Sequence, residues 1–260
     1  MRKTKLLALL VLVLIIMVIL KCCGGKQEDT QVGTEVPDEQ TQVAMAAQPD
    51  GKEVRLGKVS ENEDGGVVIT LTNEDGTEQT VTFTDVAIDS WYVDAVNYVI
   101  STNLMSGATD KPLFRPEYGT KRAEFAATLY NFGGGEPEAA QKSYPDLSGN
   151  EWFGDCVAWV TNHGYMNGKS DGTFDPEGFL SCEEALIILH RFAGEPKPEG
   201  TLENYPYAPK VSSYGQDAVT WAWNNGLITE KECVWYPTQT VSRAQVALLM
   251  MRYSALMNGT

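Results

Sequence analysis

The fold is decided by the stretch Phe83-Thr84-Asp85-Val86 and by the residues after it, because the same order of residue types returns twice further along the chain. The next features along the chain are Trp91, Phe114-Arg115-Pro116 and Lys121-Arg122-Ala123-Glu124. A similar order begins again near Tyr144 and near Tyr205. A period near 60 residues is typical of structural repeats. We therefore predict three repeats, at about residues 83–135, 144–195 and 205–257.

The spacing inside the first repeat predicts two short helices joined by a loop. Trp91, Ala95, Tyr98 and Val99 fall on one helical face, whereas the segment 106–119 is rich in Gly and Pro. A second helix is predicted from near Thr120 to the Gly133-Gly134-Gly135 stop. Two short helices cannot bury their apolar faces alone. We therefore expect the repeats to pack together as one mostly helical domain over residues 83–257.

The preceding segment, residues 51–82, is rich in residues that favour strands. Asp64-Gly65 and Asp75-Gly76 separate its β-rich runs, which is the pattern of hairpin turns. The sequence predicts a small β-meander of two or three strands, too small to be stable alone. Before it, residues 24–50 are polar with scattered Pro and Gly, and we predict a flexible linker there.

The N-terminus is typical of an export signal. Three basic residues within the first five positions precede the apolar run Leu6–Leu20, which is shorter than the roughly 20 residues of a spanning helix. Residues 1–23 are predicted to be a signal peptide or a membrane or lipid anchor, with the remainder outside the membrane. Cys23 is a candidate for lipidation because Leu20-Lys21-Cys22-Cys23 is similar to a lipoprotein site. An uncleaved signal anchor and ordinary cleavage are the alternatives.

The charge balance argues against several function classes. The 260 residues include 20 Lys and Arg against 35 Asp and Glu, a net charge of −15. Binding to nucleic acid or to an anionic lipid surface requires an excess of basic residues. The sequence also lacks Gly-x-Ser-x-Gly, phosphate-loop and His-Glu-x-x-His motifs. We predict a protein that is not an enzyme, uses no cofactor, binds no nucleic acid and meets the membrane only through its N-terminus.

Residues that often bind metals show no ligand spacing here. Cys156, Cys182 and Cys233 form no Cys-x-x-Cys pair and are predicted to be small buried apolar residues. His163 and His190 have no further ligands at suitable spacing, so no metal site is predicted. The run 171–175 contains Asp-Gly but lacks the alternating oxygen ligands of a calcium loop, which favours a turn.

The repeated motifs resemble the S-layer homology family. Units of that family open on Phe-x-Asp-Val, place a Trp a few residues later, and contain Asp-Gly-x-Phe-x-Pro and Thr-Arg-Ala-Glu. The corresponding residues of this chain are Phe83–Val86, Trp91 and Lys121–Glu124, then Trp152, Asp171–Pro176 and Ser181–Glu184, then Ser242–Gln245. The resemblance covers about two-thirds of the chain. It implies a mostly α fold, in which three helix-loop-helix repeats pack as a pseudo-three-fold helical prism behind the small β-meander.

The resemblance also implies a function and a set of site residues. Family members bind secondary cell-wall polysaccharide, a peptidoglycan-linked polymer that often ends in a pyruvylated sugar, in the grooves between units. A pyruvate ketal carries a carboxylate, for which a fixed Arg is the natural counterpart. The ligand-binding residues that the resemblance marks are Arg122, Trp91, Asp85, Glu124, Arg243, Trp152 and Asp146. Arg122 is expected to be the main anionic contact, supported by Trp91 and Asp85, with Arg243 at a weaker second site.

Departures from the motifs leave alternatives open. Cys182 replaces the motif Arg of the second unit, and Ala208 and Tyr214 lie where the third would have Asp and Trp. The two arginines also suit plain helix N-termini, and the two tryptophans also suit the core. The predicted function is therefore a non-catalytic cell-envelope protein that binds wall polysaccharide at the cell surface. The alternative is a surface scaffold whose degenerate repeats bind a protein partner.

Overall fold

The computed structural model describes residues 54–259. By its internal contacts the chain divides into residues 1–41 and 42–260, and every described residue belongs to the second unit. The predicted signal or anchor (residues 1–23), the lipidation candidate Cys23 and the predicted linker (residues 24–50) lie outside the described residues. In the described part, no helix combines the length and the apolar character that crossing a membrane requires.

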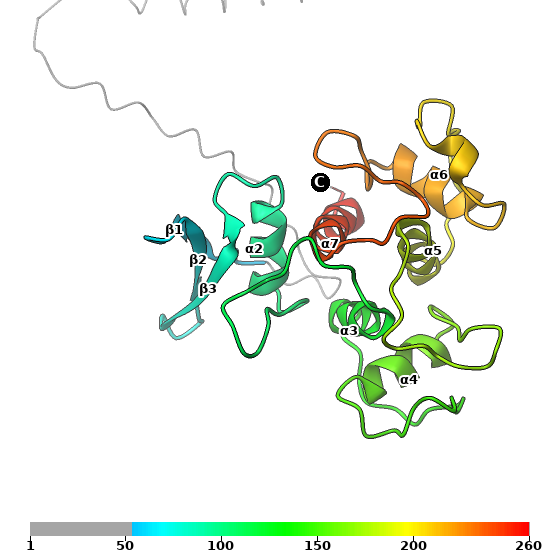
Figure 1. Ribbon diagram of the computed structural model, residues 1–260, viewed down its shortest axis with the longest axis horizontal. Helices are drawn as coiled ribbons and strands as arrows, with labels where there is room; N and C mark the ends of the chain where they lie inside the picture. Colours follow the sequence, from blue (N-terminus) through cyan, green and yellow to red (C-terminus); the bar gives the residue numbers. More distant parts are fainter. Residues whose placement is uncertain (1–53, 260) are drawn as a thin grey trace, which may run out of the picture. The chain divides into compact units, whose positions relative to one another are not determined.

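A three-stranded antiparallel sheet opens the described part, at the blue to cyan end of Figure 1. Its strands are β1 (Lys58–Glu61), β2 (Gly66–Thr72) and β3 (Glu78–Ala87), in the order β1-β2-β3. The two Asp-Gly turns join them, and both Gly65 and Gly76 have a φ of +81°, which glycine adopts without strain. The predicted meander is thus a sheet of three strands, but β3 continues into the first predicted repeat as far as Ala87.

The sheet packs on the first helix that follows it. Val67 and Ile69 alternate toward the core, as a half-buried strand requires, and join the same buried cluster as Val96. Hydrogen bonds to Gly57 add to this packing: Asn97 donates to its carbonyl oxygen at 2.9 Å and its N–H donates to the Ser101 hydroxyl at 2.9 Å. The sheet is therefore stabilised by burial against the helical part.

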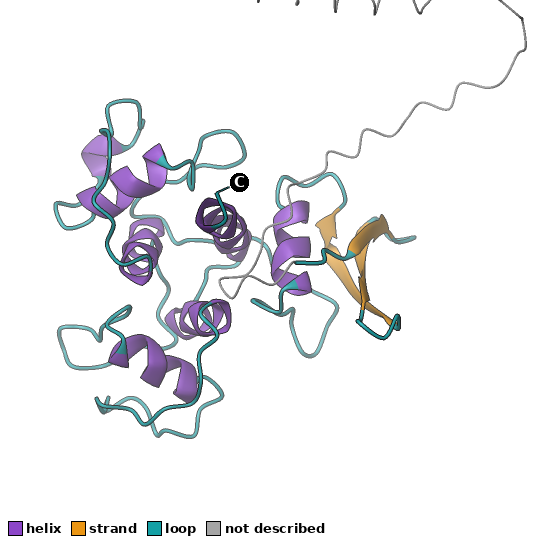
Figure 2. Ribbon diagram, turned by 180° about the vertical axis from the view of Figure 1, so that it is seen from behind, coloured by secondary structure: helices purple, strands orange, loops and turns teal. Residues whose placement is uncertain are grey.

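Six α-helices and one short 3-10 turn follow the sheet in the described residues. They are α2 (Val93–Ser101), α3 (Arg122–Phe132), α4 (Gly154–Asn162), α5 (Cys182–Phe192), η1 (Ala208–Lys210), α6 (Gln216–Asn224) and α7 (Arg243–Met257). Helix α2 contacts α7, α3 contacts α4, and α5 contacts α6. Figures 1 and 2 show α3, α5 and α7 next to one another and almost end-on, with the other helices around them.

The three inner helices share an aromatic cluster. Phe132 of α3, Phe192 of α5 and Tyr253 of α7 meet pairwise, with ring centroids 5.4, 5.9 and 6.1 Å apart. Offset and edge contacts at such distances stabilise aromatic pairs beyond their buried area. One core therefore connects segments that lie more than a hundred residues apart in the chain.

Backbone hydrogen bonds link the first turns of these same helices to one another's loops. The first N–H groups of an α-helix have no partner within the helix. The bonds that satisfy them run from Arg122 N to Gly178 O at 2.8 Å, from Cys182 N to Gln239 O at 2.8 Å and from Arg243 N to Tyr118 O at 2.9 Å. Each acceptor lies in the loop before another of the three helices, so the bonds form a closed circuit.

The prediction of a mostly α fold with three helix-loop-helix repeats packed as a pseudo-three-fold helical prism is wrong. Helices hold about a third of the described residues, and the sheet and loops hold the rest. The loop between α2 and α3 extends from Thr102 to Lys121, and its Gly and Pro residues keep it from being helical. These loops supply acceptors of the closed circuit and side chains of the core, so much of the packed structure is not helical.

Candidate functional site

A groove of about 820 Å³ lies along one side of α3. Its base is the helical face formed by Glu124, Ala127, Thr128 and Asn131, which are spaced three or four residues apart. The loop 103–119 forms one wall. Three residues from distant parts of the chain complete the lining: Trp152, Phe179 and Arg243. The groove therefore exists only where the repeated segments meet.

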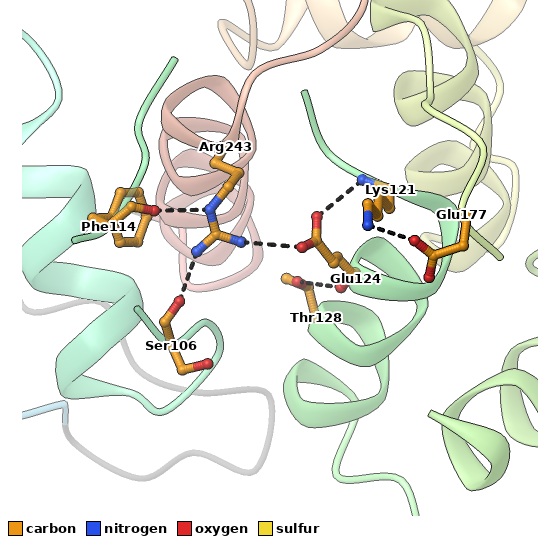
Figure 3. A network of polar contacts seen from close by, with 7 residues as sticks. All are labelled: Ser106, Phe114, Lys121, Glu124, Thr128, Glu177 and Arg243. Atoms are coloured by element: carbon orange, nitrogen blue, oxygen red, sulfur yellow. Dashed lines mark hydrogen bonds and ion pairs between the residues drawn. The ribbon is translucent and has the colours of Figure 1, made fainter. Parts of the chain in front are cut away.

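Arg243, the first residue of α7, holds the loop wall in place. Its Nε donates to the carbonyl oxygen of Phe114 at 2.9 Å, and its Nη2 donates to that of Ser106 at 2.6 Å (Figure 3). The guanidinium carbon lies 4.9 Å from the ring centroid of Phe114. Burial lowers the pKa of Arg243, an effect that nearby Glu124 opposes. Only 12% of the side chain is exposed, so a fixed positive charge lies at the edge of the groove.

Glu124 and Lys121 lie at the start of α3. The Glu124 carboxylate accepts a hydrogen bond from the Lys121 backbone N–H at 3.0 Å, which caps the helix, and its other oxygen lies 3.9 Å from Arg243 Nη1. The Lys121 ammonium forms an ion pair with Glu177 (Figure 3). Lys121 lines the groove, whereas Glu177 does not.

The lining of the groove is more positive than the protein as a whole. Three cationic side chains, Arg115, Lys121 and Arg243, face two carboxylates, Asp110 and Glu124. Three minus two gives a net charge of +1 within a chain of net charge −15. A cleft whose sign opposes that of the surface around it favours an anionic ligand.

Aromatic side chains border the same groove. Trp152 is 72% exposed, although its ring makes an edge contact with the buried Phe153 at 5.2 Å. Tyr118 and Phe179 are also exposed and line the groove. A large exposed ring that is supported from behind offers an apolar face to a ligand.

Arg122, predicted as the main anionic contact, does not line the groove. The residue is only 5% exposed. Its Nε donates to the carbonyl oxygen of Phe174 at 2.8 Å and its Nη2 to that of Asn167 at 2.7 Å, and burial lowers its pKa. A ligand could reach this guanidinium only by displacing the loop that it holds. The structure therefore gives Arg122 a role between segments of the protein.

Asp85 and Asp146, also predicted as ligand-binding residues, each hold a loop. The Asp85 carboxylate accepts from the N–H groups of Phe114 at 2.8 Å and Arg115 at 2.7 Å. Asp146 accepts in the same way from Phe174 at 2.9 Å and Asp175 at 2.7 Å. Arg115 and Asp175 have φ of 61° and 58°, a left-handed backbone that is uncommon outside glycine. The two carboxylates therefore stabilise strained turns.

The predicted residues thus fall into two groups. Arg243, Glu124 and Trp152 come together in the groove, whereas Arg122, Asp85 and Asp146 lie away from it. Trp91 is also outside: it is half-buried, and its ring packs edge-on against Tyr92 at 5.0 Å. Sequence reasoning missed Lys121, Phe179 and Tyr118. The one available signal was that Lys121 occupies the position of the Thr in the family motif.

Arg122 and Arg243 each form a junction between the start of a helix and a distant loop. The third junction, at the start of α5, has no arginine. Cys182 lies at the first position of α5, where α3 and α7 have Arg122 and Arg243, and it is buried. There the hydroxyl of buried Tyr205 donates to the carbonyl oxygen of Trp235, the counterpart of the carbonyls held by the two arginines. Tyr205 therefore replaces the missing guanidinium as the donor.

The remaining polar and sulfur-containing candidates have structural surroundings. Cys156 is buried like Cys182, and Cys233 is half-buried; burial raises the pKa of these thiols to about 11 for Cys156 and Cys233 and about 12 for Cys182. Asp171 accepts from the Thr173 N–H at 3.0 Å and so forms a turn. Within residues 54–259, no group of three or more His, Cys, Asp or Glu side chains is arranged to hold a metal ion.

Residues 82–126 and 143–186 match the S-layer homology domain. The two S-layer homology segments include Asp85, Trp91 and Arg122 in the first and Asp146 and Trp152 in the second. The match does not include residues 205–257, so the third repeat stays a prediction.

Curated relatives are similar over part of the chain. A stretch of 170 residues, 64% of the chain, is 27% identical to the S-layer protein sap of Bacillus anthracis and covers 20% of it. A stretch of 124 residues, 46% of the chain, is 30% identical to a cellulosome-anchoring protein of Acetivibrio thermocellus and covers 27% of it. A third stretch, of 192 residues and 72% of the chain, is 24% identical to the exoglucanase XynX of Acetivibrio thermocellus and covers 17% of it. The chain thus spans about a sixth to a quarter of the length of these relatives.

Proposed function

We propose that this protein is a non-catalytic cell-surface protein that binds secondary cell-wall polysaccharide through the groove beside α3. The observation that carries the proposal is the combination, in one groove, of the exposed ring of Trp152 with the cations Lys121 and Arg243 in an otherwise acidic protein. The two S-layer homology segments and the similarity to S-layer and cellulosome-anchoring proteins support a location at the cell surface or cell wall.

The groove suits an acidic sugar better than a neutral one. A pyranose ring has an apolar face that can pack on an exposed indole such as Trp152. A carboxylate on that sugar, as in a pyruvate ketal, would then meet the positive lining of the groove. Glu124 and the carbonyl groups of the loop wall are acceptors for sugar hydroxyls.

The proposal is tested by cosedimentation of the full chain with purified cell-wall sacculi. We expect Trp152→Ala to weaken binding by about two- to twelvefold, because stacking contacts of this kind contribute about 0.5–1.5 kcal/mol. Tyr214→Ala is the matched control, since Tyr214 is 74% exposed but does not line the groove. Sacculi from which the secondary polymer has been extracted should retain none of the three proteins. Equal binding by Trp152→Ala, Tyr214→Ala and the parent would show that the groove is not the binding site.

A surface scaffold that binds a protein partner is the second candidate. The observation that favours it is the set of exposed rings at the groove, Tyr118, Trp152 and Phe179, because aromatic residues are enriched at protein interfaces. The same assay separates the two functions. A scaffold would bind equally well to extracted sacculi that retain their surface proteins, and would lose binding after protease treatment of the sacculi.

A further inference from the structure

We infer that Lys121 is the residue that selects an acidic sugar in this groove, and that Glu177 competes with the ligand for it. This inference rests on the proposed function and assigns the charge contact within it. Lys121 lines the groove with Trp152, and its ammonium is paired with a carboxylate that lies outside the lining. A bound anion would therefore take the place of Glu177 without any movement of the backbone.

The other two cations of the groove already have partners within its lining. Arg243 donates to the carbonyl oxygens of Ser106 and Phe114 and is mostly buried, so it positions the loop wall. Arg115 lies 3.8 Å from Asp110, which lines the same groove and offsets its charge there. Lys121 is the remaining cation of the lining, and its charge is offset only from outside the groove.

The ion pair of Lys121 is also open to exchange. The Lys121 side chain is 39% exposed and that of Glu177 is 68% exposed. Ion pairs this exposed contribute little to stability, because water screens the attraction and both long side chains lose freedom. The α3 N-terminus adds positive potential from its N–H groups next to Lys121. An anion that arrives on the Trp152 ring would thus compete against a weak partner.

Lys121 deprives α3 of a side-chain cap that the other two inner helices have. A role in binding would explain why a lysine lies there. At the equivalent positions before α5 and α7, the hydroxyls of Ser181 and Ser242 each accept a hydrogen bond at 3.2 Å from the third residue of the helix. An ammonium has no acceptor, so Lys121 forgoes that cap. A lysine at this position therefore weakens the start of α3 and places a positive charge in the groove.

The test uses the full chain and a matched pair of sugars: a methyl hexopyranoside bearing a 4,6-linked pyruvate ketal, and the methyl ester of that same ketal. Binding is followed by tryptophan fluorescence. We expect the parent to prefer the acid over the ester by about fivefold. Lys121→Thr should abolish this preference and raise the melting temperature, because the hydroxyl restores the cap. A merely structural role for Lys121 would not move affinity and stability in opposite directions.

Two further variants and a control complete the design. Glu177→Gln should strengthen binding of the acid by about two- to threefold and leave the ester unchanged, because the competitor is removed. Lys121→Arg should retain the preference. Lys169→Thr is the control, since Lys169 has similar exposure and pairs with Glu184 at 3.8 Å but does not line the groove.

The outcomes separate this inference from the proposed function. If folded Lys121→Thr still prefers the acid, or if the parent binds acid and ester equally, the role of Lys121 is rejected while wall binding stands. If the parent is retained on sacculi but binds neither sugar, the acidic-sugar ligand is rejected and the proposed function again stands. If the parent binds neither the sugars nor sacculi, the proposed function fails, and the inference fails with it.

Discussion

Arg243 holds both the ring and the backbone of Phe114: its guanidinium carbon lies 4.9 Å from the ring centroid, and its Nε donates to that residue's carbonyl oxygen at 2.9 Å. Arg122 repeats the arrangement on Phe174, at 4.9 and 2.8 Å. Both phenylalanines are fully buried in loops that lack regular secondary structure. The first residue of each helix thus holds a distant loop against the core. We call this contact between an arginine and a loop phenylalanine a clamp.

Arg122→Lys should lower the free energy of unfolding by about 2–3 kcal/mol. A lysine cannot reproduce a fork that reaches both the Phe174 and the Asn167 carbonyl oxygens, so at least one of them loses its charged donor. Urea unfolding followed by circular dichroism measures the change. Binding to sacculi should stay near that of the parent under conditions where the variant is folded. Parent-like stability combined with lost binding would return Arg122 to the ligand site.

Arg243→Lys should affect both stability and binding. We expect a smaller loss in the free energy of unfolding, about 1–2 kcal/mol, because the side chain keeps some contact with water. Sacculus binding should also fall, since the loop that Arg243 holds through Ser106 and Phe114 is a wall of the groove. The two arginine variants therefore form a pair in which only one alters binding. Equal binding losses in both would contradict the distinction between them.

Tyr205→Phe tests the junction where Cys182 replaces the arginine. The hydroxyl of Tyr205 is buried with the Trp235 carbonyl oxygen, so its removal should cost about 1–3 kcal/mol in unfolding free energy. Cys182→Arg alone should also destabilise, because its site is buried and the acceptor is already occupied. The double variant should lose less than the sum, with a coupling energy of about 1 kcal/mol or more. Additive losses would mean that the two side chains do not share this role.

Glu151→Gln should lower the melting temperature at pH 7 but not near pH 2. The Glu151 carboxylate accepts from the Ser148 N–H at 2.7 Å and the Gly149 N–H at 2.9 Å, and these hydrogen bonds lower its pKa from 4.5 to about 2. Because the folded pKa lies below the unfolded value of 4.5, the ionised carboxylate stabilises the folded protein fully at pH values above 4.5. This stabilisation is lost as the pH falls toward 2. Thermal melts of both proteins at pH 7, 4 and 2.5 measure the difference. A difference that stays constant across this range would exclude the carboxylate as its source.

Local signals in the sequence were sufficient for the individual elements. The first helix, predicted from the helical spacing of Trp91, Ala95, Tyr98 and Val99, extends from Val93 to Ser101, because apolar spacing is a local feature. Phe114, an apolar residue within the predicted loop 106–119, is fully buried. The fold class was wrong because apolar spacing does not show that long segments without regular structure pack as tightly as helices.

The candidate site was harder to predict because its residues come from separate segments. The sequence places Trp91 and Trp152 at equivalent motif positions, yet one is half-buried beside Tyr92 and the other is 72% exposed at the groove. Arg122 and Arg243 likewise occupy the same helix position, but only Arg243 borders the groove. Motif spacing fixes where a residue lies on its own helix. What it faces depends on loops that are 45 to 137 residues away in the chain.

The clamp between Arg243 and Phe114 joins residues that are 129 positions apart, and this separation determines when the groove can form. A chain leaves the ribosome with its N-terminus first, so α3 and the loop wall are made well before the residue that fastens them. A nascent chain that stops short of α7 has the base of the groove but lacks the hydrogen bonds that hold its wall. Contacts this distant in sequence also form late in folding, because the intervening chain must first be ordered. The groove that we propose for wall binding is therefore complete only after α7 has been made.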